Sequence, residues 1–408
     1  MRTAAFIFCV FFAVHGFAQR LETPRLAGQT SISLNAFAQG SGKGISNGFL
    51  TDLITEDVLP GESIDRMLDL STTDRRIGFD YSTSFAATWA IDENPWSISF
   101  LLSDHFHGSG ELTNDMLSLG FKGNSTSLGE ELDLGPSRAQ WFQFQKIGLG
   151  GTHEALHSSI SLSLSYVNVQ RWGSLVLDQS SLYTSQLGDT LRYDLIGSFS
   201  MSDTSGGARR HRGGGAAVDL AYTRTFTLED VTWRLSGVVR DLGMVQNHAG
   251  TGWDWDTLGD FTGILDVDLL ALEDGSLADQ LSDSADRSLR SFQNGGVRNS
   301  WLPGWGQISM EQEKDKGLLV GFGATWRWHA NADPYAWVSV GHRFNERWMI
   351  SGDLGYGGYG TIQSNLRAVM ELTSIRAYLR LSNVEALLLS NSLAGAGVAV
   401  GIQYGIGK

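Results

Sequence analysis

Large apolar side chains alternate with small or polar ones along much of this chain. A clear early example is the stretch from Ile77 to Ile91, IGFDYSTSFAATWAI, whose odd positions are mostly aromatic or aliphatic and whose even positions are small or polar. Side chains alternate across a β-strand with period two, so this stretch predicts a strand with one apolar face. A strand that spans a membrane needs about 9–11 residues, and this one is long enough. A half-buried strand of a soluble sandwich would fit equally well.

Recurrence of the pattern favours a barrel over a sandwich. Similar alternation occurs at 96–103, 159–166, 191–201, 214–226, 231–241, 318–328, 348–356, 362–372, 375–381 and 396–406. The chain has 50 glycines but only 6 prolines, which is typical of many strands joined by tight turns. The prediction is therefore an all-β fold, a closed antiparallel transmembrane β-barrel of about 14 strands, within a range of about 12–16.

The polar side of the last strands carries charge. Arg327, Arg367, Glu371, Arg376 and Arg380 all fall on the polar parity of their segments. An arginine facing lipid at the membrane midplane would cost about 2–4 kcal/mol, so these five side chains are predicted to face the lumen. Aromatic residues near strand ends favour interfacial girdles, and they are Trp89, Trp96, Trp326, Trp328, Trp348, Tyr356 and Tyr404.

Three segments lie outside the strand pattern. Residues 1–18 have a basic residue, a short apolar run and small residues before Gln19, which predicts a cleaved signal peptide and export to the outer membrane. Residues 19–76 are predicted to form one short strand and a plug-like or periplasmic segment with short helices, so that the barrel occupies 77–408. Residues 244–303 lack alternation and are predicted to form one long, acidic, helical loop.

Composition excludes several kinds of partner and chemistry. The formal net charge is −14, which makes nucleic acid an improbable partner. The single cysteine, Cys9, lies in the predicted signal peptide, so disulfides and cysteine-dependent sites are not expected. No nucleophile, phosphate-binding loop or paired-carboxylate motif stands out, and we expect neither enzymatic activity nor a cofactor.

The sequence contains possible metal ligands, but ordinary loop residues explain them better than a metal site does. The pairs His105 with His107 and His153 with His157 have no acidic neighbour at ligand spacing, and a set of aspartates between 254 and 268 matches no calcium loop. No metal site is predicted. The dense basic cluster of Arg209, Arg210 and Arg212 lies in a glycine-rich loop and is a candidate docking site for lipopolysaccharide phosphates or a protein, although a solvated loop tip is the favoured explanation.

Several short motifs resemble a known family. These are GGGAAVDL at 213–220, SGVVRDLGM at 236–244, SLNAFAQGSGKGISNGFL near the N-terminus, Leu302-Pro303 and the ending AYLRLSNVEALLL with GAGVAVGIQYGIG. The sequence resembles a Bacteroidetes-type family of outer-membrane β-barrels of unknown function, itself similar to FadL-type and PorV-like barrels. The chain departs from the usual barrel ending because its last residues, Gly407 and Lys408, are not aromatic.

The resemblance implies location and fold and leaves two functional hypotheses. The first is a monomeric, FadL-like channel or transporter for a small ligand, including a hydrophobic one. The second is a non-transporting barrel that acts as a secretion or assembly partner, as PorV-like proteins do, using its long loop and arginine-rich tip. Outer-membrane lipid and lipopolysaccharide are the expected surroundings in either case.

Overall fold

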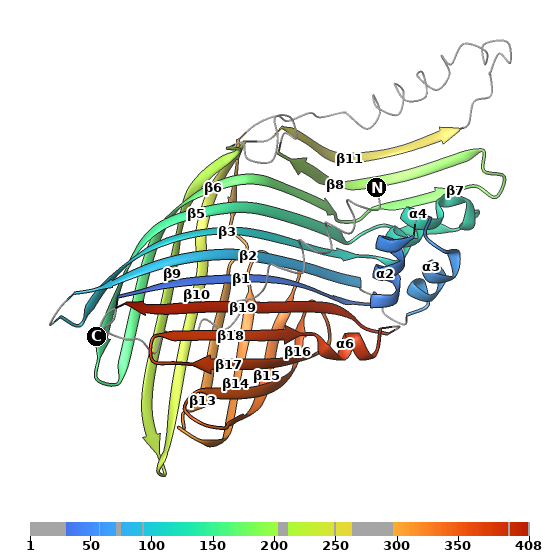
Figure 1. Cartoon of the computed structure of the whole chain (residues 1–408). Helices are drawn as coiled ribbons and strands as arrows, with labels where there is room; N and C mark the ends of the chain where they lie inside the picture. The colour runs from blue at the N-terminus through green and yellow to red at the C-terminus, as the bar shows by residue number, and fades with distance from the viewer. Residues whose placement is uncertain are drawn as a thin grey trace.

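The chain forms a closed antiparallel barrel of 14 strands (Figure 1), which confirms the predicted fold class. The computed structural model describes residues 30–56, 58–70, 75–91, 94–202, 211–248, 250–262, 297–390 and 392–406. Each wall strand pairs with the next one along the ring, and β19 pairs with β1 from Thr30 opposite Ile406 to Gly42 opposite Ala394. In ring order the wall consists of β1 (Thr30–Lys43), β2 (Arg75–Ala90), β3 (Trp96–Leu112), β5 (Ser137–Ala155), β6 (Ser158–Leu177), β9 (Gly213–Leu228), β10 (Val231–His248), β13 (Trp305–Gln312), β14 (Gly317–Arg327), β15 (Asp333–Arg343), β16 (Trp348–Gly358), β17 (Ile362–Glu371), β18 (Ile375–Ser382) and β19 (Ala394–Ile406).

The two ends of the barrel differ in how the strands are joined. At one end, here called the turn end, short turns connect β2 to β3, β5 to β6 and β9 to β10. The last of these is a two-residue turn in which Glu229 and Asp230 both have positive φ, the geometry of a type I′ hairpin. At the other end, here called the loop end, several connections are much longer. They contain β4 (Glu131–Asp133), β7 (Ser181–Thr184), β8 (Thr190–Met201), β11 (Thr251–Thr262) and β12 (Val297–Trp301).

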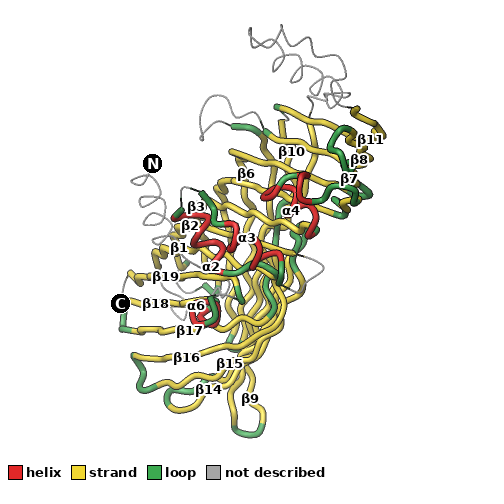
Figure 2. Tube along the Cα trace, turned by 90° about the vertical axis from the view of Figure 1, so that its right-hand side faces the viewer, coloured by secondary structure: helices red, strands yellow, loops and turns green. Residues whose placement is uncertain are grey.

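Short helices gather at the loop end (Figure 2). Ser46 caps α2 by accepting a hydrogen bond from the backbone N–H of Phe49, and Thr113 caps α4 by accepting one from the backbone N–H of Met116. The helical elements are α2 (Asn47–Thr55), α3 (Gly61–Leu68), α4 (Asn114–Lys122), the 3-10 turn η1 (Asn124–Thr126) and α6 (Val384–Leu388). Within the described residues, none of them is long and apolar enough to cross a membrane.

A buried arginine fastens these helices to the wall. The guanidinium of Arg75, at the start of β2, is 1 % exposed and donates hydrogen bonds to the carbonyl oxygens of Leu68 and Leu70 at 2.9 and 3.1 Å. It also donates to the carbonyls of Gly44 and Met67. These carbonyls belong to the segments that enter α2 and leave α3. The helices therefore cannot move away without leaving a buried charge unsatisfied.

The wall has an apolar exterior and a polar interior. Every wall strand presents at least one large, exposed apolar side chain on its outer parity, as in Leu34, Trp89, Ile98, Leu149, Leu164, Leu220, Leu242, Ile308, Phe322, Val338, Leu354, Leu366, Leu379 and Val400. The alternate positions are buried and polar, as with Asp80 and Ser82 between Phe79 and Phe85. The period-two pattern thus separates outside from inside.

Two of the predicted segment boundaries are wrong. The wall starts at Thr30 and not at Ile77, because residues Ser31 to Lys43 pair along their whole length with β2. The predicted long loop contains strands at both ends. Residues 251–262 pair with β8, while 297–301 pair with β10. Their alternation is interrupted by aspartates and glycines, which hid them. The helical spacing at 269–281 and the predicted signal peptide lie outside the described residues.

Candidate functional site

A large cavity lies inside the barrel, and its lining extends inward from the turn end. Its volume is about 310 Å³, at the lower end of the range usual for small-molecule sites. Its lining begins at the second residues of β1, β3 and β6, namely Ser31, Ser97 and Ser159. It continues inward to Asp80 and Arg327, which also line a smaller cavity of about 30 Å³ near Tyr359.

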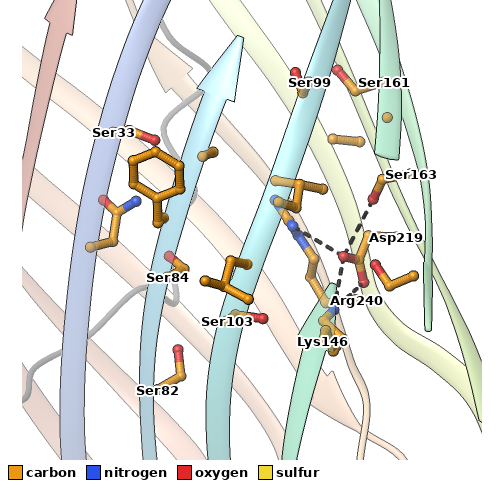
Figure 3. Close-up of a pocket in the computed structure, with 18 of the residues that line it drawn as sticks. Ser33, Ser82, Ser84, Ser99, Ser103, Lys146, Ser161, Ser163, Asp219 and Arg240 are labelled. Carbon is orange, nitrogen blue, oxygen red and sulfur yellow. Dashed lines mark hydrogen bonds and ion pairs between the residues drawn. The ribbon is translucent and has the colours of Figure 1, made fainter. Parts of the chain in front are cut away.

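Serine is the most frequent residue in the wall of this cavity, and several of its serines are labelled in Figure 3. Eleven of its lining residues are serines, contributed by β1, β2, β3 and β6, and two are threonines. Some hydroxyls pair across neighbouring strands, such as Thr88 with Ser99 at 2.9 Å and Thr152 with Ser161 at 2.8 Å. Serine recurs at every second residue from Ser159 to Ser165, so the inward parity of the first half of β6 forms a row of hydroxyls.

A buried charge cluster lies at the inner side of this hydroxyl wall (Figure 3). Lys146 of β5 donates to both carboxylate oxygens of Asp219 on β9, at 3.0 and 2.9 Å, and pairs with Asp241 of β10. Arg240 lies 3.4 Å from Asp219. The side chains of Lys146, Asp219 and Asp241 are 5–7 % exposed. The two positive and two negative groups balance one another.

A β-bulge builds this cluster. The register between β9 and β10 shifts between Val239 and Leu242, so the two consecutive residues Arg240 and Asp241 both face the lumen. Asp241 has φ 58°, a left-handed conformation that aspartate tolerates better than most residues. Its backbone N–H donates to Asp219 at 2.8 Å.

A second charge cluster crosses the lumen. Arg327 on β14 lies 2.8 Å from Asp80 on β2, and His107 Nδ1 lies 2.8 Å from the other oxygen of Asp80. The ring order places β14 seven strands from β2 in either direction, so this ion pair joins opposite walls. We call Asp80, His107, Arg327 and Tyr359 the cross-lumen latch.

Tyr359 completes the latch from the connection between β16 and β17. It is 4 % exposed, its hydroxyl lies 3.5 Å from His107 Nδ1, and the Arg327 guanidinium lies 5.8 Å from its ring centre. The ring rests on Gly78 of β2, where a Cβ atom would come within 2.2 Å of ring atoms. Only glycine at position 78 leaves room for this aromatic ring.

Further contacts hold the loop end closed beside the latch. The turn between β14 and β15 reaches β3, where the backbone N–H of Asn331 donates to Ser109 at 3.4 Å. It also reaches β5, where Gln140 donates to the carbonyl of His329. Arg76 of β2 pairs with Asp333 of β15 at 2.7 Å. The latch and these contacts lie between the large cavity and the loop end and narrow the lumen there.

The five predicted lumen residues all lie on the inner face, but the structure divides them between different sites. Arg327 belongs to the latch, and Arg376 lines both the large cavity and a second one of about 90 Å³. Arg367 lines that second cavity. Glu371 accepts from Arg343 at 2.7 Å and lies 3.2 Å from Arg376. Arg380 lies 3.5 Å from Asp353. Whether any of the five contacts a ligand stays a prediction.

The predicted docking cluster is wrong in one of its three residues. Arg212 is 5 % exposed, and its side chain donates to the carbonyl of Gln170 at 3.3 Å, so it is not part of a solvated loop tip. Its backbone also pairs with Val169 and His248, which extends the sheet and draws the arginine inward. Arg209 and Arg210 lie outside the described residues.

The histidine pairs take other roles. His107 bonds to Asp80, His105 bonds to Ser103 at 2.8 Å and stacks on Phe144, and His153 packs on Trp96. Among the described parts of the chain, no group of three or more His, Cys, Asp or Glu side chains is arranged to hold a metal ion.

Sequence reasoning missed most of the residues that shape the lumen. Asp80, Lys146 and Asp219 lie on the inward parity of their strands, and this parity was the signal that could have identified them. Asp241 gave no such signal because the bulge changes its parity. Tyr359 lies in a connection, where strand periodicity says nothing about direction.

Comparison with protein-family models gives no match, and neither does comparison with curated proteins. Among solved structures, the chain is similar to the Ralstonia pickettii toluene transporter TbuX, at 11 % identity over 95 % of this chain and 93 % of that one, with a TM-score of 0.42. A Pseudomonas aeruginosa FadL homologue matches at 10 % identity over 92 % and 90 %, with a TM-score of 0.44. The translocator domain of the Neisseria meningitidis autotransporter NalP matches at 10 % identity over 99 % and 98 %, with a TM-score of 0.33. Because these sequence identities and TM-scores are low, the fold is assigned from the strand pairing alone.

Proposed function

We propose that this protein is an outer-membrane β-barrel that binds a small solute in its lumen and passes it across the membrane. This proposal rests on one observation, a closed 14-stranded wall with exposed apolar side chains on every strand and a cavity of about 310 Å³ inside. Closure satisfies the backbone hydrogen bonds of the wall internally, as a lipid environment requires. Short turns at one end and long connections at the other correspond to the periplasmic and extracellular sides of bacterial barrels.

Aromatic side chains support this placement. Trp89, Trp96, Trp348 and Tyr404 are exposed near the turn end, and Trp326 and Tyr356 are exposed near the loop end. Two such belts are typical of the interfaces of a membrane-spanning barrel. Trp328, which the sequence grouped with them, instead packs over Gly304.

The alternative role as an assembly partner has weaker support. It relied on an arginine-rich tip, of which Arg212 is buried, and on a long loop, of which 251–262 and 297–301 belong to the sheet. By contrast, the lumen contains a formed cavity. Solute binding is therefore the function that the geometry favours.

Placement in lipid can be tested on the exterior of the wall. Leu366, midway along β17, is 49 % exposed. Leu366→Arg should lower the free energy of unfolding in lipid vesicles by about 2–4 kcal/mol, since the charge would enter hydrocarbon. In a water-soluble protein the same exposed change would stay within about 0.5 kcal/mol. Leu156→Arg, at a turn residue that is 91 % exposed, is the matched control and should be neutral.

Passage of solute can be tested with the full chain in vesicles. Vesicles that contain the protein should swell in isotonic solutions of small solutes faster than protein-free vesicles. The rate should fall with solute size, because the cavity is small. If vesicles with the protein swell no faster than protein-free vesicles in any solute, the transport role is contradicted. This holds whether or not Leu366→Arg lowers the free energy of unfolding.

A further inference from the structure

We infer that the large cavity binds a neutral, polyhydroxylated solute of the size of a small sugar, a proposal that rests on the proposed function. Thirteen serine and threonine residues line one continuous part of the wall, and hydroxyls both donate and accept hydrogen bonds. A ligand that bears several hydroxyls of its own can pair with such a wall from many directions. The inference names a substrate class for the lumen site.

The charges at the cavity argue against an ionic ligand. Lys146 is held between Asp219 and Asp241, and Arg240 lies against Asp219. Arg327 pairs with Asp80, and Arg376 with Glu371. An organic anion would have to compete with these intramolecular pairs, whereas a neutral ligand leaves them intact. An organic cation would find one carboxylate outside these pairs, that of Glu154.

The hydroxyls argue against an apolar ligand in the same cavity. An apolar molecule would displace water from the wall, and each hydroxyl left without a partner costs roughly 1–3 kcal/mol. Ser165 already shows this need. It is 2 % exposed and lines the cavity, and its Oγ has no hydrogen-bond partner among the described residues.

The cavity also offers flat apolar faces beside the hydroxyls. Phe37 and Tyr378 pack together at one side, and Phe144 stacks with His105 at 4.9 Å on the other. A sugar ring has hydroxyls at its rim and C–H groups on its faces, and such a ring suits a cavity with hydroxyl walls and aromatic patches. A simple ion could use only the hydroxyl groups of the cavity, and a purely apolar solute could use only its aromatic side chains.

The test uses the full-length, detergent-solubilised protein and isothermal titration calorimetry with four probes: glucose, sucrose, gluconate and toluene. The triple variant Ser33→Ala, Ser84→Ala, Ser99→Ala removes three hydroxyls from three strands of the cavity without adding bulk. The triple variant Ser309→Ala, Ser339→Ala, Ser351→Ala is the control. Its serines are also inward but more deeply buried, and they line the second cavity.

We expect a sugar to bind the wild type, the first triple variant to bind it at least tenfold more weakly, and the control to match the wild type. Heat-modifiable migration on gels checks that each variant is folded. The inference is overturned if neither sugar binds, if gluconate or toluene binds more tightly than both sugars, or if the first triple variant keeps wild-type affinity. Vesicle swelling separates this failure from failure of the proposed function, because a channel for another solute class would still be permeable.

Discussion

Replacing Arg327 by alanine should open a passage between the large cavity and the loop end and raise the conductance of the protein in planar bilayers several-fold. Arg327 and Asp80 come from opposite walls of the barrel, and their side chains form an ion pair at 2.8 Å. The guanidinium of Arg327 also lies 5.8 Å from the centre of the Tyr359 ring. Its removal deletes the side chain that bridges the two walls. Asp80 then becomes free to be hydrated, and pore width together with the lining charge sets conductance.

Two controls separate the latch from general effects of removing an arginine. Arg327→Lys keeps a cation near Asp80 and should raise the conductance less than the alanine variant. Arg192→Ala removes an arginine from a pair with Asp260, whose side chains are 61 % and 54 % exposed, and should leave the conductance unchanged. Equal conductance of Arg327→Ala and wild type would show that the passage is closed elsewhere, at the contacts of Asn331 and His329.

The wall was predictable because period-two alternation reports directly on which side of a strand faces away from the lumen. In β14 and in β16 to β19 the pattern gave inward and outward faces correctly, since the pairings β16–β17, β17–β18 and β18–β19 have no register shift. The segment of β15, whose pairing with β16 is shifted between Asp333 and Ala336, was not predicted as a strand. The first strand, Thr30–Lys43, was cut short because its outward face ends in Ala36, Ala38 and two glycines and so loses its apolar signal. Alanine and glycine allow neighbouring strands to pack closely, but they do not distinguish the outward face of a strand from its inward face.

The lumen site was less predictable because its residues come together from distant strands. Asp80 and Arg327 are separated by 247 positions in the chain, and only closure of the barrel brings them into contact. The same applies to Lys146 and Asp219, which depend on the pairing of β5, β6 and β9. Strand parity could have marked each as inward, but the partner of each charge depends on the order and tilt of strands around the ring.

Replacing Lys146 by methionine should lower the free energy of unfolding by about 3–5 kcal/mol, the usual result of breaking a buried ion pair on one side. Methionine has a similar length but no charge. Asp219 and Asp241 would then remain close together in a site where both are about 95 % buried, and their repulsion would no longer be offset. Urea titration in lipid vesicles, followed by tryptophan fluorescence, measures the change.

Two comparisons identify the cause of such a loss. In the triple variant Lys146→Met, Asp219→Asn, Asp241→Asn, the carboxylates are neutral as well, and most of the stability should return. The charge that remains is Arg240, which loses Asp219 but is 24 % exposed and can be hydrated. Lys122→Met removes a lysine that pairs with Asp65 at the surface of α4 and should change stability by less than about 1 kcal/mol. A loss at Lys146 as small as that at Lys122 would mean that water, and not the lysine, balances the two aspartates. If the triple variant were as unstable as Lys146→Met, then packing of the lysine stem, and not its charge, would hold β5 against β9 and β10.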